Sequence, residues 1–276
     1  MLLIGQHTLL DRVTLLKLPQ FLILIGPEGQ GKKIITKAIA ESFGLPLINM
    51  TSNINGVREC IENTISMEEE QMFAFYDIDT MSLAAKNSLL KITEEPPKNL
   101  HIVITACNES NVLPTLISRG QVYHLDKYTT KELKEYAKEC NFNLSDELLE
   151  MVDNPKDINI LKNLDYKEFY NYVNLVFDNI FKARLGNCLK IGNKIAYKDD
   201  DEGYPIKLFF KMFIKICKDE FINNPNDTIM NLGIYTNEAL GELCNPSLNK
   251  HMIFDNWLIR VKVNNWIDIV KECIYK

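Results

Sequence analysis

NSLLKITEEPPKNLHIVITACNESNVLPTLISRG, residues 87–120, combines a helical pattern, a buried strand and a polar Ser-Arg corner in one short stretch. Apolar residues at helical spacing lead up to Pro96 and Pro97, which end a helix because proline cannot continue the backbone hydrogen bonding. Leu100–Ala106 then forms a continuous apolar run, typical of a strand that is buried on both faces of a parallel sheet. The stretch predicts a domain of the α/β class.

A glycine-rich loop, GPEGQGKK, lies upstream, between another apolar run and another helical pattern. This is the context of a phosphate-binding loop. Gly26, Gly29 and Gly31 are expected to take positive φ angles and to bring backbone N–H groups close to an anion. Lys32 is placed to reach the outer phosphates. Lys33 stands where a hydroxyl would hold magnesium, so that ligand is missing.

Residues 87–97, NSLLKITEEPP, resemble the signature helix of bacterial clamp-loader subunits of the gamma, tau and delta prime kinds. LPTLISRG, ending at Gly120, is similar to the family segment that ends in Ser-Arg-Cys, and the loss of the small cysteine side chain is expected to loosen this turn. The resemblance covers residues 1 to about 165 and implies an AAA+ core. It also implies that Arg119 crosses a subunit boundary to stabilise phosphates bound by a neighbour, a role suited to a guanidinium.

The same resemblance places the first acid of the Walker B strand at Tyr76 and the second acid at Asp77. In active relatives the second acid polarises the attacking water. With Lys33 and Tyr76 in place of both metal-binding groups, the sequence predicts a degenerate site with no ATP hydrolysis of its own. An alternative alignment to the family pattern would make Asp77 the first acid and Asp79 its near neighbour, but this alignment requires a deletion before Met81.

Two interpretations of the glycine-rich loop stay open. Either ATP or ADP binds weakly at the segment from Gly26 to Lys33, or the segment is a strand-to-helix turn kept for packing. Asn108, at the end of a predicted strand, is a candidate for the sensor of the terminal phosphate, although asparagine there is also a common turn former. Lys156 occupies the place of a second, basic sensor, where a solvated lysine is the simpler interpretation.

Composition limits the partners that we expect. A net charge of −6 and a pI near 5.4 argue against an independent DNA-binding surface, so DNA contact is expected only collectively, within a complex. We see neither an apolar run of about 20 residues nor a secretory signal, which predicts a cytoplasmic protein without a membrane partner. Seven scattered cysteines without a Cys-x-x-Cys pair predict no zinc site, unlike the zinc module of related subunits.

Five strands are expected at about residues 21–25, 45–50, 72–77, 100–106 and 120–125, and the resemblance implies the parallel sheet order 5-1-4-3-2. It also implies an AAA+ core over residues 1–126, a helical lid over 127–164 and an all-α, collar-like domain over 165–276. Large apolar residues at helical spacing in the last part are expected to form its core; they are Phe169, Tyr170, Phe177, Phe181, Phe209, Phe210 and Phe213.

The resemblance therefore implies a subunit of delta prime type that does not hydrolyse ATP. Its expected partners are other clamp-loader subunits in a hetero-oligomeric ring and the sliding clamp, within a complex like the DNA polymerase III holoenzyme. Before assembly, Arg119 is expected to lie on the surface, unpaired or only loosely paired. Two alternatives remain, namely an active ATPase like gamma and tau, and a scaffold that kept the fold without the loader role.

Overall fold

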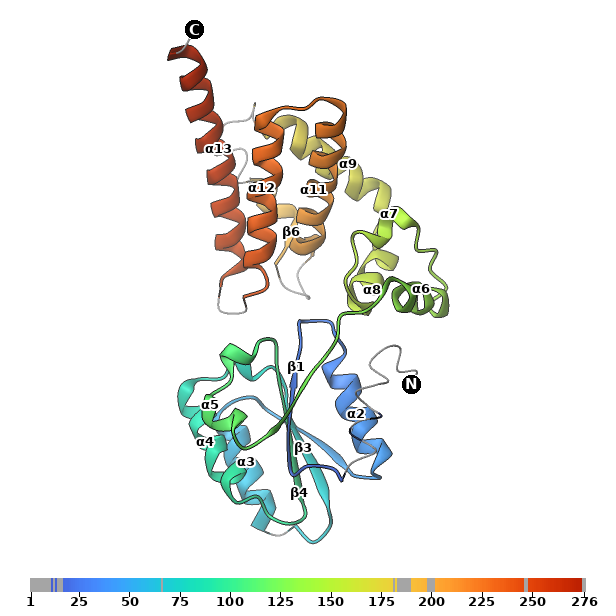
Figure 1. The fold of residues 1–276 in the computed structure, drawn as a ribbon, viewed down its shortest axis with the longest axis vertical. Coiled ribbons are helices and arrows are strands. Elements are labelled where there is room, and N and C mark those ends of the chain that lie inside the picture. The colour runs from blue at the N-terminus through green and yellow to red at the C-terminus, as the bar shows by residue number, and fades with distance from the viewer. Residues whose placement is uncertain are drawn as a thin grey trace. The chain divides into compact units, whose positions relative to one another are not determined.

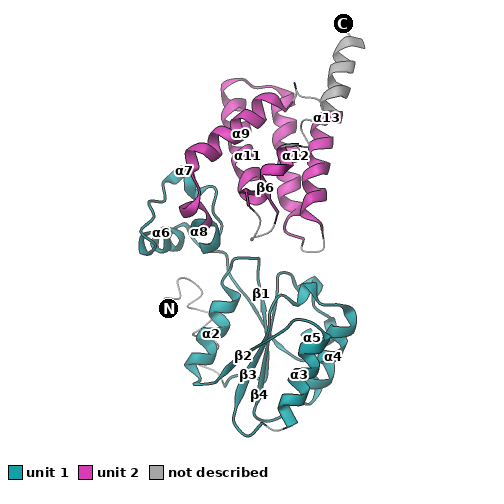
Figure 2. Cartoon of the chain, turned by 180° about the vertical axis from the view of Figure 1, so that it is seen from behind, with its two compact units in different colours: residues 1–158 teal, residues 159–276 magenta. Residues whose placement is uncertain are grey.

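The computed structural model describes residues 11, 13, 17–65, 67–180, 182, 190–197, 202–245 and 248–274, with the backbone alone at 190 and 264–274. The chain forms two compact units, residues 1–158 and 159–276 (Figure 2). The boundary between the two units falls inside the helix α8 (Pro155–Asn163). This two-part division does not test the three-part division expected from the sequence, which stays a prediction.

The first unit contains an α/β core followed by short helices (Figure 1). Its elements are β1 (Phe21–Ile25), α2 (Lys32–Ser42), β2 (Leu47–Met50), α3 (Ile54–Ile65), β3 (Gln71–Phe75), η1 (Ile78–Thr80), α4 (Leu83–Glu94), β4 (Leu100–Ala106), η2 (Glu109–Asn111), α5 (Pro114–Ile117), β5 (Gln121–His124), α6 (Thr130–Glu139), α7 (Asp146–Leu149) and α8 (Pro155–Asn163). All neighbouring strands of the five-stranded sheet are parallel, in the order β2-β3-β4-β1-β5. Read in reverse, this is the expected order, and the predicted α/β fold with a parallel five-stranded sheet is confirmed.

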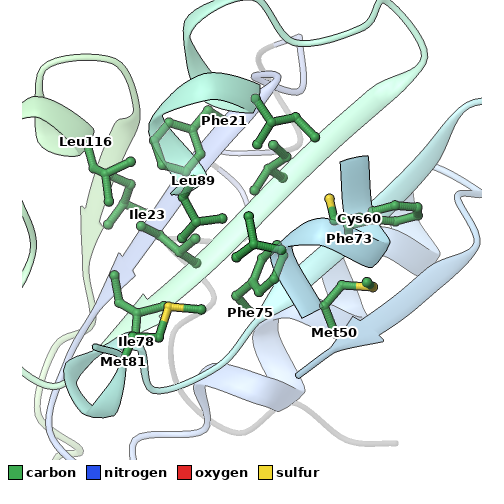
Figure 3. Close-up of a cluster of buried hydrophobic side chains, with 14 of the residues drawn as sticks. Phe21, Ile23, Met50, Cys60, Phe73, Phe75, Ile78, Met81, Leu89 and Leu116 are labelled. Atoms are coloured by element: carbon green, nitrogen blue, oxygen red, sulfur yellow. The ribbon is translucent and has the colours of Figure 1, made fainter. Parts of the chain in front are cut away.

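Both faces of the sheet are covered, which explains why β1 and β4 read as continuous apolar runs. Side chains alternate between the faces of a strand, so Phe21 and Ile23 lie in one core while Leu22 and Leu24 lie in the other. Figure 2 shows α2 on one side of the sheet and α3, α4 and α5 on the other. The larger core, which includes Phe73 and Phe75, lies beneath these three helices (Figure 3).

Short polar caps begin the helices at the positions that the sequence indicates. The Thr129 hydroxyl accepts a hydrogen bond from the backbone N–H of Glu132, whose carboxylate in turn accepts one from the backbone N–H of Thr129. Ser145 caps α7 in a similar way through the N–H of Leu148. Such caps satisfy N–H groups that have no partner within the helix.

The second unit is mainly helical. Its elements are α9 (Tyr166–Asn179), η3 (Lys190–Lys194), β6 (Ile195–Ala196), β7 (Tyr204–Pro205), α11 (Ile206–Asn223), α12 (Asp227–Glu242) and α13 (Lys250–Ile274). The two short strands β6 and β7, which pair in parallel, were not predicted. The expected helical character is present, together with this small sheet.

An aromatic cluster fills the core of the second unit. Phe209 and Phe213 pack edge-on against Trp257, with ring centroids 5.7 and 5.1 Å away. The indole N–H of Trp257 donates to the Thr236 hydroxyl at 2.9 Å, so its one polar group is satisfied inside the core. Of the other aromatic residues expected there, Phe169 and Phe210 are fully buried, Phe177 is half-buried, Tyr170 is exposed, and Phe181 lies outside the described residues.

Neither a membrane-spanning helix nor a metal-binding cluster of side chains is found among the described residues. Among them, no helix is long and apolar enough to cross a membrane. Nor do three or more histidine, cysteine, aspartate or glutamate side chains of that part of the chain gather as they would around a metal ion. Cys188 and the side chain of Cys273 lie outside the described residues.

We expect the helix α4 to depend on its buried face. Leu89 is 0% exposed and belongs to the larger core, whereas Leu83, on the same helix, is 63% exposed. Leu89→Ala should lower the free energy of unfolding by about 2–5 kcal/mol because it leaves a cavity, and Leu83→Ala should change it by less than about 0.5 kcal/mol. Urea unfolding followed by circular dichroism would measure both, and equal effects would contradict the packing described.

Candidate functional site

The glycine-rich loop and the Walker B segment meet at the carboxyl edge of the sheet. Ile25 of β1 pairs with Ala106 of β4, and Phe75 of β3 pairs with Ile104 two residues earlier in β4. The segments that follow β1, β3 and β4 therefore leave the sheet at the same edge, where ligands of open α/β sheets bind.

The loop has the backbone conformation of a phosphate-binding turn at two of its three glycines. Gly29 and Gly31 have φ angles of 83° and 78°, as expected. The expectation for Gly26 was wrong, because it does not have a positive φ. A Cβ atom at Gly26 would lie 2.9 Å from the Cβ atom of Leu125. Gly26 is therefore needed for close packing.

Lys32 directs its ammonium group back into its own loop. The side chain is almost buried, and Nζ donates to the carbonyl oxygens of Gly26 at 2.6 Å and Pro27 at 3.1 Å. It also lies 3.7 Å from the Sγ atom of Cys107, which follows β4. Burial raises the pKa of the Cys107 thiol, although the nearby Lys32 opposes this shift. A phosphate would have to compete with two carbonyl groups for the Lys32 ammonium group.

Lys33 and Tyr76, which the sequence predicts in the places of two metal-binding groups, lie against each other. The Lys33 ammonium is 5.2 Å from the centre of the Tyr76 ring, within the range of a cation–π contact. Tyr76 follows β3 directly, and its hydroxyl donates to Asn49 Oδ1 at 3.0 Å. Burial raises the pKa of the Tyr76 phenol, so the group is neutral at pH 7. An ammonium group cannot coordinate Mg²⁺, and a neutral phenol lacks the negative charge of the carboxylate oxygens that hold this ion.

Asp77 and Asp79 hold the turn after β3. Asp77 has a φ angle of 53°, and its N–H donates to the buried Thr105 hydroxyl at 2.9 Å. The Asp79 carboxylate accepts from the N–H of Cys107 at 2.7 Å and from the Asn111 side chain at 3.0 Å. Asp79 thus fixes the loop after β4, a structural role that does not favour the alternative register.

Asn108 begins the short helix η2. Its carbonyl oxygen accepts a hydrogen bond from the N–H of Asn111 at 3.1 Å, and the residue is exposed. Asn108 has an extended backbone, and its side chain makes no capping hydrogen bond to this turn. A sensor role for Asn108 stays a prediction.

Residues at the start of α8 contact the glycine-rich loop directly. Lys156 Nζ forms an ion pair with Glu28 Oε1 at 2.6 Å, and the Asn154 amide donates to the Glu28 carbonyl oxygen at 3.4 Å. A Cβ atom at Gly29 would lie 2.5 Å from the buried Asn154 side chain. Lys156 is therefore paired rather than simply solvated, and Gly29 is required both for its φ angle and for this close approach.

Arg119 lies on the surface just after α5, as expected, but it has partners within its own domain. Its Nη2 atom lies 2.7 Å from Glu94 Oε1, and Nη1 donates to the Thr115 carbonyl oxygen at 2.6 Å. The expectation that Arg119 is unpaired or only loosely paired was wrong. Its side chain remains 32% exposed to solvent.

Arg119 and the glycine-rich loop lie at opposite ends of the parallel strands, with Arg119 at the amino end and the loop at the carboxyl end. Arg119 precedes β5, whose first residue pairs with Leu22 near the start of the parallel strand β1, whereas the loop follows the end of β1. A strand of five residues spans about 16 Å. This separation exceeds the length of an arginine side chain, so Arg119 cannot reach the loop of its own chain.

Gly120 tightens the Arg119 corner, contrary to expectation. A Cβ atom there would lie 2.7 Å from two side-chain atoms of Ile23 and 2.9 Å from the ring of Phe21. The space of the missing side chain is thus filled by β1, and the turn is not loosened.

Three contact residues were not predicted from the sequence. Glu94 lies within the signature helix, but nothing in its spacing shows that it pairs with Arg119. Asn154 caps α8, as its place before Pro155 indicates, yet its contact with the loop is long-range. Glu28 belongs to the loop itself, and its contact with Lys156 is also long-range.

Part of the chain is similar to known replication proteins. Residues 47–129 match the family model described as DNA polymerase III, delta subunit. The chain resembles a clamp-loader subunit. The DNA polymerase III subunit delta' of Buchnera aphidicola (subspecies Baizongia pistaciae) is 26% identical over 175 residues, which are 60% of this chain and 49% of that protein.

Two further similarities concern a curated protein and a solved structure. An uncharacterised MG007 homologue of Mycoplasma pneumoniae is 33% identical over 100 residues, 35% of this chain and 40% of that protein. The chain thus spans less than half of the length of either curated relative. A gamma subunit-related protein of DNA polymerase III from Thermotoga maritima shares the fold, with a TM-score of 0.52, 17% identity and coverage of 94% of this chain and 99% of that one.

The close contact at Gly120 leads to a stability prediction. Gly120→Ala, which adds only a Cβ atom, should lower the free energy of unfolding by about 1–3 kcal/mol because it crowds Ile23 and Phe21. Gly241→Ala, on α12, provides a control, because a Cβ atom there meets nothing within 4 Å and alanine favours helix. Chemical unfolding would compare the two, and a Gly120→Ala variant as stable as the wild type would contradict the packing.

Proposed function

We propose that the chain is a clamp-loader subunit of delta prime type, which does not hydrolyse ATP and provides Arg119 to the nucleotide site of a neighbouring subunit. The match to the delta subunit model and the similarity to a delta' subunit support the class of protein. The fold agrees with it.

The contact between Lys33 and Tyr76 carries the non-hydrolysing part of the proposal. Each replacement alone removes a group that would hold magnesium. Because the two side chains also face each other at 5.2 Å, they form a local structure of their own, worth about 0.5–1 kcal/mol for an exposed cation–π pair. In this proposal Asp77, at the degenerate Walker B position, has no water to activate.

Nucleotide binding at the loop, if retained, is proposed to be weak. ATP or ADP would have to draw Lys32 away from two carbonyl oxygens and separate Lys156 from Glu28. The N–H groups of the loop remain the elements that would contact phosphate. Asn108 keeps only a proposed sensor role.

The position of Arg119 supports its action on another subunit. It lies at the end of the strands opposite its own loop, and its side chain is partly exposed. An always charged, planar guanidinium is suited to phosphate charge that develops on a neighbour. A hetero-oligomeric ring of loader subunits, the sliding clamp, and DNA bound collectively by that ring are the proposed partners, in the cytoplasm.

The three-part organisation belongs to the same proposal. The AAA+ core of residues 1–126 would provide the Arg119 corner, the lid of residues 127–164 would cover the loop, and residues 165–276 would join the ring. The helices of this last part have exposed apolar residues, among them Leu175, Met230 and Met252, which agrees with an assembly role.

The isolated chain should show negligible ATPase activity. Lys33→Thr alone should not restore it, because Tyr76 still occupies the first Walker B position. A coupled assay of phosphate release, with Lys32→Ala as the background control, would measure this. Turnover typical of loader ATPases that is lost in Lys32→Ala would instead support the alternative of an active gamma/tau-like subunit. A large gain from Lys33→Thr alone would support the Asp77 register.

Arg119→Ala should leave the fold and ring assembly unchanged and lower the ATPase activity of the assembled complex by roughly 10³- to 10⁵-fold, the range for arginine fingers. Arg119→Lys should recover little, because lysine lacks the planar fork. Reconstitution with the host loader subunits, followed by ATPase and clamp-loading assays, would measure this. Normal activity of the alanine variant would favour the scaffold alternative.

A further inference from the structure

We propose that Glu94 is a positioning residue that holds and orients the Arg119 guanidinium for the neighbouring subunit. This inference rests on the proposed function, because it concerns how Arg119 would reach a partner's phosphates. The carrying observation is the ion pair between Glu94 Oε1 and Arg119 Nη2 at 2.7 Å. It joins the end of the signature helix α4 to the Ser-Arg corner, two segments that the sequence analysis singled out separately.

The arrangement fixes the guanidinium at two points. Glu94 accepts from Nη2, and the Thr115 carbonyl oxygen accepts from Nη1 at 2.6 Å. Two separate acceptors define the direction of a planar group, whereas one acceptor would leave it free to turn. A charged carboxylate is the stronger of the two acceptors.

The same arrangement leaves donors for a phosphate. A guanidinium has five N–H groups, and the two contacts to Glu94 and Thr115 use two of them. The remaining donors belong to a side chain that is 32% exposed. In this proposal a neighbour's phosphate accepts from these remaining donors while the Glu94 pair stays intact, so the pair orients Arg119 without blocking it.

Both ends of the pair are attached to a packed core. Leu89 and Ile92 of α4 lie in the same buried cluster as Leu116 of α5. The backbone positions of Glu94 and Arg119 are thus set by packing against one face of the sheet. A contact between side chains on such fixed supports gives a defined geometry, which a positioning role requires.

The local electrostatics of Glu94 are unfavourable without Arg119. Glu94 is the last residue of α4, and a negative charge at the carboxyl end of a helix is opposed by the helix dipole. The positive guanidinium offsets this. The adjacent Glu95 is also exposed, but the ion pair with Arg119 is formed by Glu94, which makes Glu95 a matched control.

An Arg119 side chain already ordered by Glu94 would lose less conformational entropy when the subunits assemble. An arginine side chain that moves freely loses many rotamers when it enters a neighbour's site. If Glu94 has already ordered it, less is lost at that step. Loss of Glu94 should therefore affect the rate of the chemical step in the neighbour, where the position of Arg119 matters, and not the affinity of the neighbour for ATP.

The test uses the full chain, reconstituted with the host loader subunits, and measures kcat and KM for ATP. Glu94→Ala should lower kcat by about 10- to 100-fold, as expected for a misplaced group, with KM unchanged. Glu94→Gln, which keeps an oxygen acceptor but removes the charge, should fall between Glu94→Ala and the wild type. Glu95→Gln should behave as the wild type.

A double variant separates positioning from a purely structural effect. If Glu94 acts through Arg119, Glu94→Ala combined with Arg119→Ala should be no slower than Arg119→Ala alone, because coupled residues are not additive. Independent, multiplied losses would overturn the inference. Melting temperatures of all variants check folding, and the isosteric Glu94→Gln retains the test should Glu94→Ala fail to fold.

The failures of the two proposals are distinguishable. If Arg119→Ala has normal activity, or if the chain does not assemble with loader subunits, the proposed function is wrong and this inference falls with it. If Arg119→Ala is inactive while both Glu94 variants have a normal kcat, the proposed function stands and the positioning role is wrong. A higher kcat for Glu94→Ala would show that the pair restrains Arg119, and it too would overturn the inference.

Discussion

The structure of the first unit depends on β1, a strand with both faces and both edges occupied. All five of its residues are buried, and it pairs with β4 on one side and β5 on the other. Its carboxyl end begins the glycine-rich loop, and its amino-terminal half packs against Gly120. Both candidate sites are therefore positioned by the same strand, at opposite ends. The glycine-rich loop, a candidate binding site, is thus separated from Arg119, the candidate contact to a neighbouring subunit.

The loop at the carboxyl end is held by contacts within its own chain. Lys32 bonds to loop carbonyls, Lys33 lies over the Tyr76 ring, and Asn154 fills the space beside Gly29. These contacts stabilise the shape of the loop, including its two positive φ angles.

The sequence predicted the sheet well because strands buried on both faces give continuous apolar runs. The bounds of β1 and β4 were right to the residue. The end of β3 was not, because Asp77 takes a left-handed conformation and the chain leaves the sheet after Phe75. The two-residue strands β6 and β7 are too short to show an alternating pattern.

The site was predictable only as far as local motifs extend. The motifs located Arg119 and Lys33, but the partner of Arg119 is 25 positions away and that of Lys156 is 128 positions away. Such contacts depend on how helices pack against the sheet, which periodicity does not encode. The expectation for Gly26 failed for the same reason, since its role follows from the approach of Leu125.

The carboxyl ends and the amino ends of the strands are under different physical constraints. At the carboxyl end, the Lys33 ammonium lies against the Tyr76 ring and Asn154 packs beside Gly29. At the amino end, Gly120 has no room for a side chain and Arg119 is held between Glu94 and Thr115. A change there alters the direction of a charged group that faces outward. A subunit that no longer hydrolyses nucleotide would therefore tolerate drift in its loop while it still requires a fixed Arg119 corner.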